Sequence, residues 1–173
     1  MRAWHIIYTR PRSEKKLAAA LAKKNVEYYL PLLRMQKRWS DRTKWIEEPA
    51  FSSYVFVKID VRNEALTVLN IPHAVNFVKT LEHPAEISEE DIELLRISIE
   101  NFADSLVVRD TAELRPGQKI KIKLGPFAGK DAIIEKISGK AMILVNFPAL
   151  NQSIQVEMPV EHLESPSNHV LEA

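Results

Sequence analysis

The sequence predicts an α+β domain with a mainly antiparallel sheet, followed by a small β-barrel. Up to about residue 102, strand-like and helix-like periodicities follow each other in the order strand, helix, strands, helix, strand, helix. All four glycines lie beyond residue 114, where short β-prone runs are separated by tight turns. We therefore expect a first domain over residues 1–104, a linker over 105–114, a barrel over 115–165 and a frayed tail over 166–173.

The overall composition predicts a globular protein of the cytoplasm. The chain has 173 residues, of which 46% are hydrophobic and 27% are charged, and it contains no cysteine. The missing cysteines exclude disulfides, thiolate catalysis and cysteine-ligated zinc. No apolar run approaches the roughly 20 residues that span a bilayer, and the amino terminus has no signal-peptide pattern, so we expect no membrane association.

Charge is distributed unevenly along the chain. Residues 1–62 carry 14 Lys and Arg against 6 Asp and Glu, whereas residues 63–106 carry 2 against 9. This separation predicts a positive face that meets a polyanion, although two patches that only neutralise each other within the fold remain the alternative.

The first strand and helix place several cations on one side of the fold. Residues 3–9 alternate as a strand, and Ser13 is a suitable N-cap for a helix that continues to about residue 24. The apolar side of this helix carries Leu17 and Leu21. The opposite side and the preceding turn provide a candidate nucleic-acid surface, made of Arg10, Arg12, Lys15, Lys16 and Lys23.

The pattern of residues 33–48 predicts a long hairpin with its tip at residues 40–43. Trp39 and Trp45 flank that tip among five Lys and Arg residues. Aromatic rings among cations can stack on bases and hold phosphates, but two tryptophans can also form a cross-strand pair that stiffens a ribbon. We favour the structural role for the tryptophans, and a polyanion or an acidic protein as the partner of the cations.

Residues 54–59 predict a central strand with two different faces. Val55, Val57 and Ile59 share one face, which we expect in the core. Tyr54 and Phe56 lie on the other face, which is either covered by a helix of the same chain or open to a partner.

Capping residues predict the two remaining helices of the first domain, and a strand lies between them. Asn63 is expected to cap a short helix that ends near residue 70, and residues 74–79 form a strand. Ser88, followed by three acidic residues, predicts the start of a helix whose buried side includes Ile92 and Leu95.

The sequence contains no recognisable catalytic arrangement. The five histidines lack zinc-ligand spacing, and there is no glycine-rich phosphate loop or nucleophile elbow. We therefore expect a binding protein rather than an enzyme, with no metal and no cofactor.

Four stretches together resemble the NusG family of transcription elongation factors, which carry an N-terminal NusG domain and a C-terminal SH3-like KOW domain. They read WHIIYTRPRSEKKLAAAL, YYLPL, PAFSSYVFVKI and PGQKIKIKLGPFAGKDAIIEKI. The resemblance covers residues 3–164. The hairpin sequence RWSDRTKW and the compact length are more similar to specialised paralogues, such as RfaH and the UpxY-type antiterminators of polysaccharide operons, than to the housekeeping member; we favour the UpxY type.

The resemblance implies that the first domain grips the clamp helices of the RNA polymerase β′ subunit and leans toward the β side. The pocket for those helices would be lined by Tyr8, Phe51, Tyr54 and Phe56. Its rim differs from the usual family pattern, because Ser52 and Ser53 stand where proline and glycine are common. The basic helix side corresponds to the surface from which RfaH-like proteins touch the non-template DNA strand.

The second domain is implied to carry the KOW loop and a partner surface. The loop includes Gly125, Pro126, Phe127 and Gly129, and the partner surface includes Phe147 and Leu150. The family partners of this surface are Rho and a small-subunit ribosomal protein. Leu150 lies near the position where Rho-binding members carry phenylalanine, which argues against Rho. The β-rich runs favour a barrel over the helical hairpin that RfaH can form.

The sequence thus favours a monomeric elongation and antitermination factor that suppresses pausing at particular operons. The alternative is a KOW-containing RNA-binding protein of translation or ribosome assembly, which would use the basic surface but not an aromatic pocket. A scaffold without a nucleic-acid role would leave the positive surplus of the first 62 residues unexplained.

Overall fold

The computed structural model divides into two compact units, Met1–Asp104 and Ser105–Ala173. Each unit is described by itself. The structure describes residues 1–102, 107–110, 117–122, 128–138, 140–147, 150 and 152–158.

The first unit is built around β1 (Ala3–Thr9), which lies inside a five-stranded sheet. On one side β1 pairs antiparallel with β5 (Tyr54–Ile59), in a register that runs from Ala3 opposite Ile59 to Tyr8 opposite Tyr54. The sheet order is β2-β5-β1-β6, and β9 also pairs with β1. The remaining strands of this sheet are β2 (Glu27–Tyr29), β6 (Ala74–Phe77) and β9 (Glu86–Ile87).

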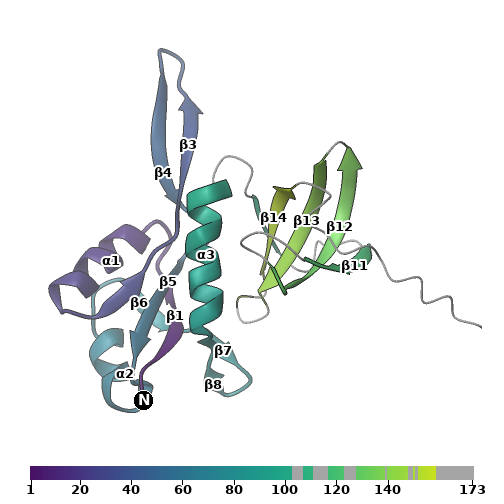
Figure 1. Ribbon diagram of the computed structural model, residues 1–173. Helices are drawn as coiled ribbons and strands as arrows, with labels where there is room; N and C mark the ends of the chain where they lie inside the picture. The colour runs from purple at the N-terminus through teal and green to yellow at the C-terminus, as the bar shows by residue number, and fades with distance from the viewer. Residues whose placement is uncertain are drawn as a thin grey trace, which may run out of the picture. The chain divides into compact units, whose positions relative to one another are not determined.

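Helices α1 (Glu14–Lys23) and α2 (Val61–Leu69) pack on one face of this sheet (Figure 1). The core they form with the sheet is mainly apolar, because alternate residues of the two central strands point toward the helices. The prediction that Val55, Val57 and Ile59 are core residues is confirmed. This cluster also includes Ile7, Leu17, Leu21, Val68, Ile71 and Phe77.

The N-cap of α2 differs from the prediction. Asp60, not Asn63, occupies the cap, where its carboxylate accepts a hydrogen bond from the Arg62 backbone N–H at 3.1 Å. Asn63 lies in the first turn and donates its side-chain amide to Asp60 at 3.1 Å. An anionic cap residue is favoured at the positive end of the helix dipole. This preference explains why the helix begins after Asp60 and not after Asn63.

Helix α3 (Glu89–Phe102) covers the other face of the sheet, the face that carries the aromatic rings (Figure 1). Ser88 caps it as predicted, because its hydroxyl accepts a hydrogen bond from the Asp91 backbone N–H at 3.1 Å. The predicted inward residues Ile92 and Leu95 are buried. The first unit therefore has three layers, with α1 and α2 on one side of the sheet and α3 on the other.

Two hairpins extend beyond the sheet. Strands β3 (Leu32–Arg38) and β4 (Thr43–Pro49) form the long predicted hairpin, which projects away from the helices (Figure 1). Strands β7 (Lys79–Thr80) and β8 (His83–Pro84) form a much shorter one that the sequence does not predict. Two-residue strands show too little alternation to be recognised as a pattern.

The second unit is a five-stranded antiparallel sheet of order β10-β14-β13-β12-β11. Residues of the expected linker form its first strand, since β10 pairs with β14. Gly117 approaches β12 closely, and a Cβ there would lie 2.7 Å from the Ile134 carbonyl oxygen, so only glycine fits. The strands are β10 (Val107–Asp110), β11 (Gln118–Lys121), β12 (Asp131–Ser138), β13 (Lys140–Phe147) and β14 (Gln152–Met158).

Over the described ranges, none of the helices combines the length and the apolar character that a membrane crossing needs.

A buried histidine makes the stability of the first unit sensitive to pH. His5 is almost fully buried, its Nδ1 lies 3.2 Å from the Ala85 carbonyl oxygen, and its ring meets Phe77 edge-on. Burial lowers the pKa of His5, because the charged imidazolium is poorly solvated there. The unfolded chain therefore binds a proton at a higher pH than the folded chain, and folding stability is lost as pH falls below the ordinary histidine pKa of about 6.5.

We predict that His5→Gln flattens this pH dependence, because glutamine can donate to the Ala85 carbonyl but does not titrate. The measurement is the free energy of unfolding from urea titrations between pH 7.5 and pH 5. His83→Gln, at an exposed position in β8, is the control. If His5→Gln loses as much stability over this range as the wild type, His5 is not the responsible group.

Candidate functional site

Three of the four predicted pocket residues lie together on one face of the β1–β5 pair. Tyr8 is directly opposite Tyr54, and Ile6 is opposite Phe56, so their side chains share that face. The Tyr8 and Tyr54 rings meet edge-on with centroids 6.1 Å apart. Phe51 joins the group from the loop before β5, where its ring lies 5.9 Å from that of Phe56.

The exposure of these four residues differs from the prediction of one open pocket. Tyr8 is 43% exposed and Tyr54 is half-buried, but Phe51 and Phe56 are only 1% and 0% exposed. Phe56 is covered because Tyr29 stacks on it at 6.0 Å, beneath α3. Phe51 and Phe56 are therefore core residues, and the open part of the site is the Tyr8–Tyr54 pair.

Charged contacts hold α3 over the covered part of this face. Lys58 Nζ lies 2.7 Å from a carboxylate oxygen of Glu89, and the Trp4 indole N–H donates to the same oxygen at 3.1 Å. These donors lower the pKa of Glu89, and the Glu89 carboxylate raises the pKa of Lys58.

Further along α3, the Arg96 guanidinium lies 5.0 Å from the Tyr29 ring and 5.9 Å from the Trp4 ring. Its position over two rings is that of a cation–π contact. Burial also raises the pKa of Tyr29. The aromatic face thus has a covered end, closed by α3, and an open end at Tyr8 and Tyr54.

The loop before β5 is fastened to the start of α1. The backbone N–H of Ser53 donates to a Glu14 carboxylate oxygen at 2.6 Å, and its carbonyl accepts from the Thr9 N–H at 2.8 Å. Glu14 is buried, which is unusual for an acidic residue. Sequence reasoning missed Glu14, because an acid in the first turn of a helix is already explained by the helix dipole.

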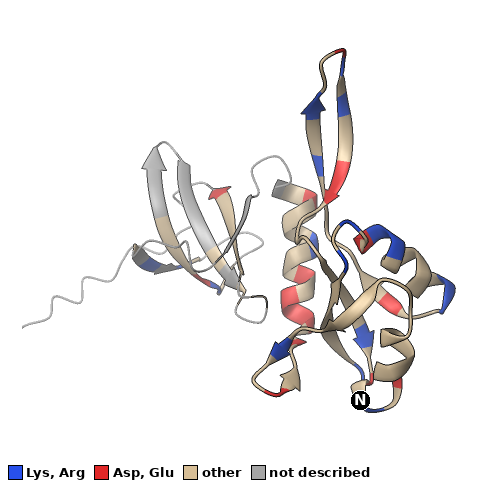
Figure 2. Cartoon of the chain, turned by 180° about the vertical axis from the view of Figure 1, so that it is seen from behind, with Lys and Arg blue, Asp and Glu red and all other residues tan. Residues whose placement is uncertain are grey.

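The predicted basic residues are all exposed, but they do not all lie along α1. Arg10 and Arg12 are in the turn between β1 and α1, and Arg12 has a left-handed backbone, with φ of 57°. Lys15 Nζ donates to the Glu47 carbonyl oxygen of β4 at 2.6 Å, so it links the helix to the base of the long hairpin. The other two residues of the set, Lys16 and Lys23, are in α1. Figure 2 shows Lys and Arg along this helix and on both strands of the hairpin.

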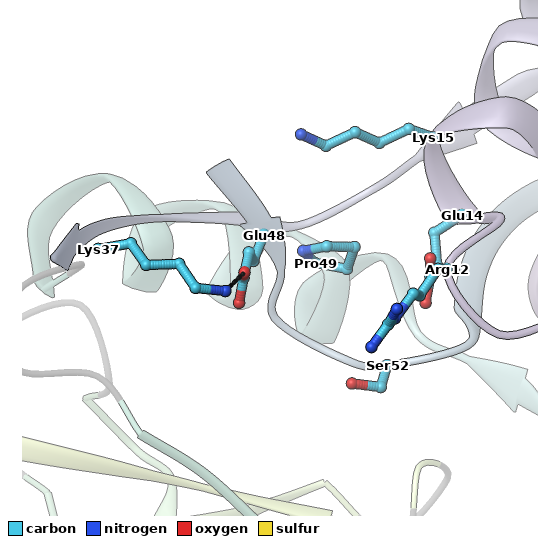
Figure 3. Close-up of a pocket in the computed structure, with 7 residues that line it drawn as sticks. All are labelled: Arg12, Glu14, Lys15, Lys37, Glu48, Pro49 and Ser52. Carbon is cyan, nitrogen blue, oxygen red and sulfur yellow. Dashed lines mark ion pairs between the residues drawn. The ribbon is translucent and has the colours of Figure 1, made fainter. Parts of the chain in front are cut away.

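A pocket of about 490 Å³ separates the start of α1 from the hairpin base (Figure 3). Glu48 pairs with Lys37 across the hairpin at 3.7 Å, and Glu14 accepts the Ser53 N–H described above. The pocket is therefore lined by three cations and two carboxylates, and of these cations Lys37 is ion-paired with one of the carboxylates, Glu48. The lining residues are Arg12, Glu14, Lys15, Lys37, Glu48, Pro49 and Ser52.

The two tryptophans of the hairpin do not form a cross-strand pair, so that prediction is wrong. Trp45 is opposite Gln36, and the Arg34 guanidinium lies 5.1 Å from the centroid of its ring. Trp39 lies beyond the end of β3, where its backbone N–H donates to the Arg42 carbonyl oxygen and closes the tip of the hairpin. Both indoles are exposed, Trp45 by 50%.

The predicted sites of the second unit lie partly outside the described residues. Gly125, Pro126 and Phe127 are among those not described, whereas Gly129 has a left-handed φ of 84° with open space around it. Phe147 and Leu150 were expected on a partner surface, but both side chains are buried, so neither is exposed to a partner in this structure.

Within the described part of the chain, no group of three or more His, Cys, Asp or Glu side chains is arranged so that it could hold a metal ion.

Comparisons with known proteins agree on one family. Residues 2–96 match the family model described as "Transcription termination factor nusG". The chain is 24% identical over 172 residues to the transcription termination/antitermination protein NusG of Campylobacter jejuni, covering 93% of this chain and 96% of that protein. The NusG protein of Pasteurella multocida is 21% identical over 141 residues, which cover 80% and 76% of the two chains.

A solved structure shares the fold. The structure titled "Domain interaction in Thermotoga maritima NusG" superposes with a TM-score of 0.59 at 19% identity and covers 95% of this chain and 97% of that one. This likeness shows the NusG fold and supports the predicted fold class.

The rim of the open site contains a strained residue that can be tested. Ser53 has a φ of 64°, a left-handed conformation that costs a residue with a side chain roughly 1–2 kcal/mol. We predict that Ser53→Gly raises the free energy of unfolding by roughly 0.5–1 kcal/mol, less than the full strain because glycine also loosens the unfolded chain. The hydrogen bonds of Ser53 are made by its backbone and are retained.

Ser52→Gly is the matched control, because Ser52 is not among the residues with positive φ. It is expected to lower the free energy of unfolding by roughly 0.5–1 kcal/mol. Urea titrations of the two variants measure the difference, and two variants of equal stability would contradict the strain at Ser53.

Proposed function

The chain belongs to the NusG family of transcription termination and antitermination factors, and on that premise we propose that it is an elongation and antitermination factor that docks on the β′ clamp helices of RNA polymerase. Members of this family are transcription factors rather than enzymes. The observation that carries the proposal is the Tyr8–Tyr54 pair at the open end of the sheet, in which Tyr8 is exposed and Tyr54 half-buried.

The tyrosine pair has the properties of a docking site for a helix of another protein. Both rings stand on paired strands and rest edge-on against each other, so less side-chain entropy is lost on binding than for free rings. Phe51 and Phe56, next along the same face, are buried and pack edge-on against each other. A partner helix could lay an apolar side against the rings and hydrogen-bond the phenolic groups at its rim.

The cations around the start of α1 give the factor a second contact. Arg10, Arg12 and the three lysines of α1 are exposed and supply a surface for the non-template DNA strand in the transcription bubble. Their charges hold phosphates and set orientation but read no bases.

Suppression of pausing would follow from binding alone. A module that contacts the clamp at Tyr8 and Tyr54 and leans over the bubble toward the β side binds the closed, elongating polymerase more tightly than the open, paused one. Differential affinity of this kind shifts the population toward elongation without any covalent step.

We further propose that the protein works as a cytoplasmic monomer at particular operons, such as those for polysaccharide synthesis, as the UpxY-like hairpin sequence suggests. A small-subunit ribosomal protein remains the proposed partner of the second unit. It would use side chains other than Phe147 and Leu150, because both are buried.

We predict that Tyr8→Ala and Tyr54→Ala each weaken binding to RNA polymerase about tenfold, because a central aromatic side chain at an interface typically contributes more than about 1 kcal/mol. Read-through of a pause site should fall in parallel. Binding is measured by titrating labelled full-length protein with core polymerase, and the circular dichroism spectrum of each variant checks its fold.

Leu66→Ala is the matched control, because Leu66 is an exposed apolar residue of α2 (78% exposed), the helix on the opposite face of the sheet. It should bind as the wild type does. Full binding by both tyrosine variants, or capture of ribosomal subunits in place of polymerase, would overturn the proposed function.

A further inference from the structure

The long hairpin carries a repulsive pair of charges. The register of β3 and β4 places Lys37 directly opposite Lys44. Like charges at directly opposed positions destabilise a two-stranded ribbon. Lys37 is partly compensated by Glu48 at 3.7 Å, whereas Lys44 takes part in no ion pair within the described residues. An anion bound between the two ammonium groups would relieve the repulsion.

The face of the hairpin opposite Lys37 and Lys44 carries an exposed aromatic ring on which a planar base could stack. Trp45 lies opposite Gln36, with the Arg34 guanidinium over its ring, and half of its surface is exposed. At the tip, Trp39 is also exposed. Indole rings accompanied by cations are the usual platform on which unpaired bases stack. A base inside a duplex is already stacked on its neighbours, so these rings favour a single strand.

The pocket at the hairpin base joins these groups to the cations beside α1. Arg12 and Lys15 reach it from the α1 side and Lys37 from β3 (Figure 3). The Lys15–Glu47 hydrogen bond of 2.6 Å fixes the distance between the helix and the hairpin. A strand of seven residues extends about 24 Å, so the hairpin adds room for several nucleotides.

We propose that the β3–β4 hairpin continues the basic surface of α1 as one track for a single DNA strand, with a backbone phosphate held in the pocket by Arg12, Lys15 and Lys37. Further along the track, Lys44, on the same face of the hairpin as Lys37, binds the next phosphate, and the bases reach around the edge of the two-stranded ribbon to stack on Trp45 and, at the tip, on Trp39. Glu48 gives up its ion pair with Lys37 when the phosphate enters, and Glu14 stays on the Ser53 N–H. This inference rests on the proposed function, in which α1 meets the DNA strand.

The test measures the binding of the full-length protein to an unstructured single-stranded oligonucleotide over a series of salt concentrations. The double variant Lys37→Gln, Lys44→Gln should bind more weakly and lower the slope of log K against log salt by about 1.4, because each phosphate that a lysine no longer neutralises reduces the slope by about 0.7. Lys79→Gln, in the short β7–β8 hairpin, is the matched control and should leave the slope unchanged.

A second variant separates stacking from charge. Trp45→Ala should weaken binding of the single strand at least fivefold with an unchanged salt slope, and should leave binding of the matched duplex unaffected. A wild-type slope for the double lysine variant would overturn the proposal. Equal reductions of single-strand and duplex binding by Trp45→Ala would overturn the stacking step. If the lysine variant binds the oligonucleotide normally but no longer binds RNA polymerase, the hairpin contacts an acidic protein surface instead.

A third variant distinguishes this inference from the proposed function. Lys16→Gln with Lys23→Gln removes charge from α1 alone, at two exposed positions. If this pair keeps the wild-type slope while the hairpin variant does not, the DNA role of α1 fails and the hairpin site stands. The reverse result would leave α1 as the DNA surface and remove the hairpin.

Discussion

The pairing of β1 with β5 determines which side chains of the first unit a partner can reach. Its antiparallel register sends Val55, Val57 and Ile59 toward α1 and α2, and sends Tyr54, Phe56 and Lys58 toward the opposite side. Helix α3 then covers that opposite side only in part. Its contacts with Lys58, Trp4 and Tyr29 close one end, and the other end stays open at Tyr8 and Tyr54. The site is therefore a consequence of where α3 lies.

Alternation and capping predicted the central strands and the three helices of this arrangement, although α2 is capped by Asp60 and not by Asn63. The inward face of β5 and the cap of α3 at Ser88 follow from side-chain period and from hydroxyl chemistry, and both are local properties. The cover over Phe56 could not be predicted in the same way. Tyr54 and Phe56 are two residues apart on one face, and only the position of a helix more than thirty residues later makes one half-exposed and the other buried.

The position of the hairpin could be predicted from the sequence, but the side chains that share each of its faces could not, because they depend on the register between β3 and β4. The sequence indicates a ribbon with a tip near residues 40–43, but whether Trp45 faces Trp39 or Gln36 depends on the exact pairing of the strands. The same pairing brings Lys37 opposite Lys44, which a count of charges along the chain does not reveal. Glu14 was missed for a related reason, because its role depends on a backbone N–H that lies 39 residues away.

The central claim is that the open end of the aromatic face, and no other part of the sheet, contacts RNA polymerase. It is tested most directly by placing a photoreactive phenylalanine derivative, one position at a time, at Tyr8, Tyr54 and Tyr28. All three tyrosines belong to the same sheet, but Tyr28 lies opposite Val57, on an edge strand and on the other face. Crosslinks to the β′ subunit are expected from positions 8 and 54, and none is expected from position 28. Crosslinks to β′ from position 28 alone, or from none of the three, would contradict this claim.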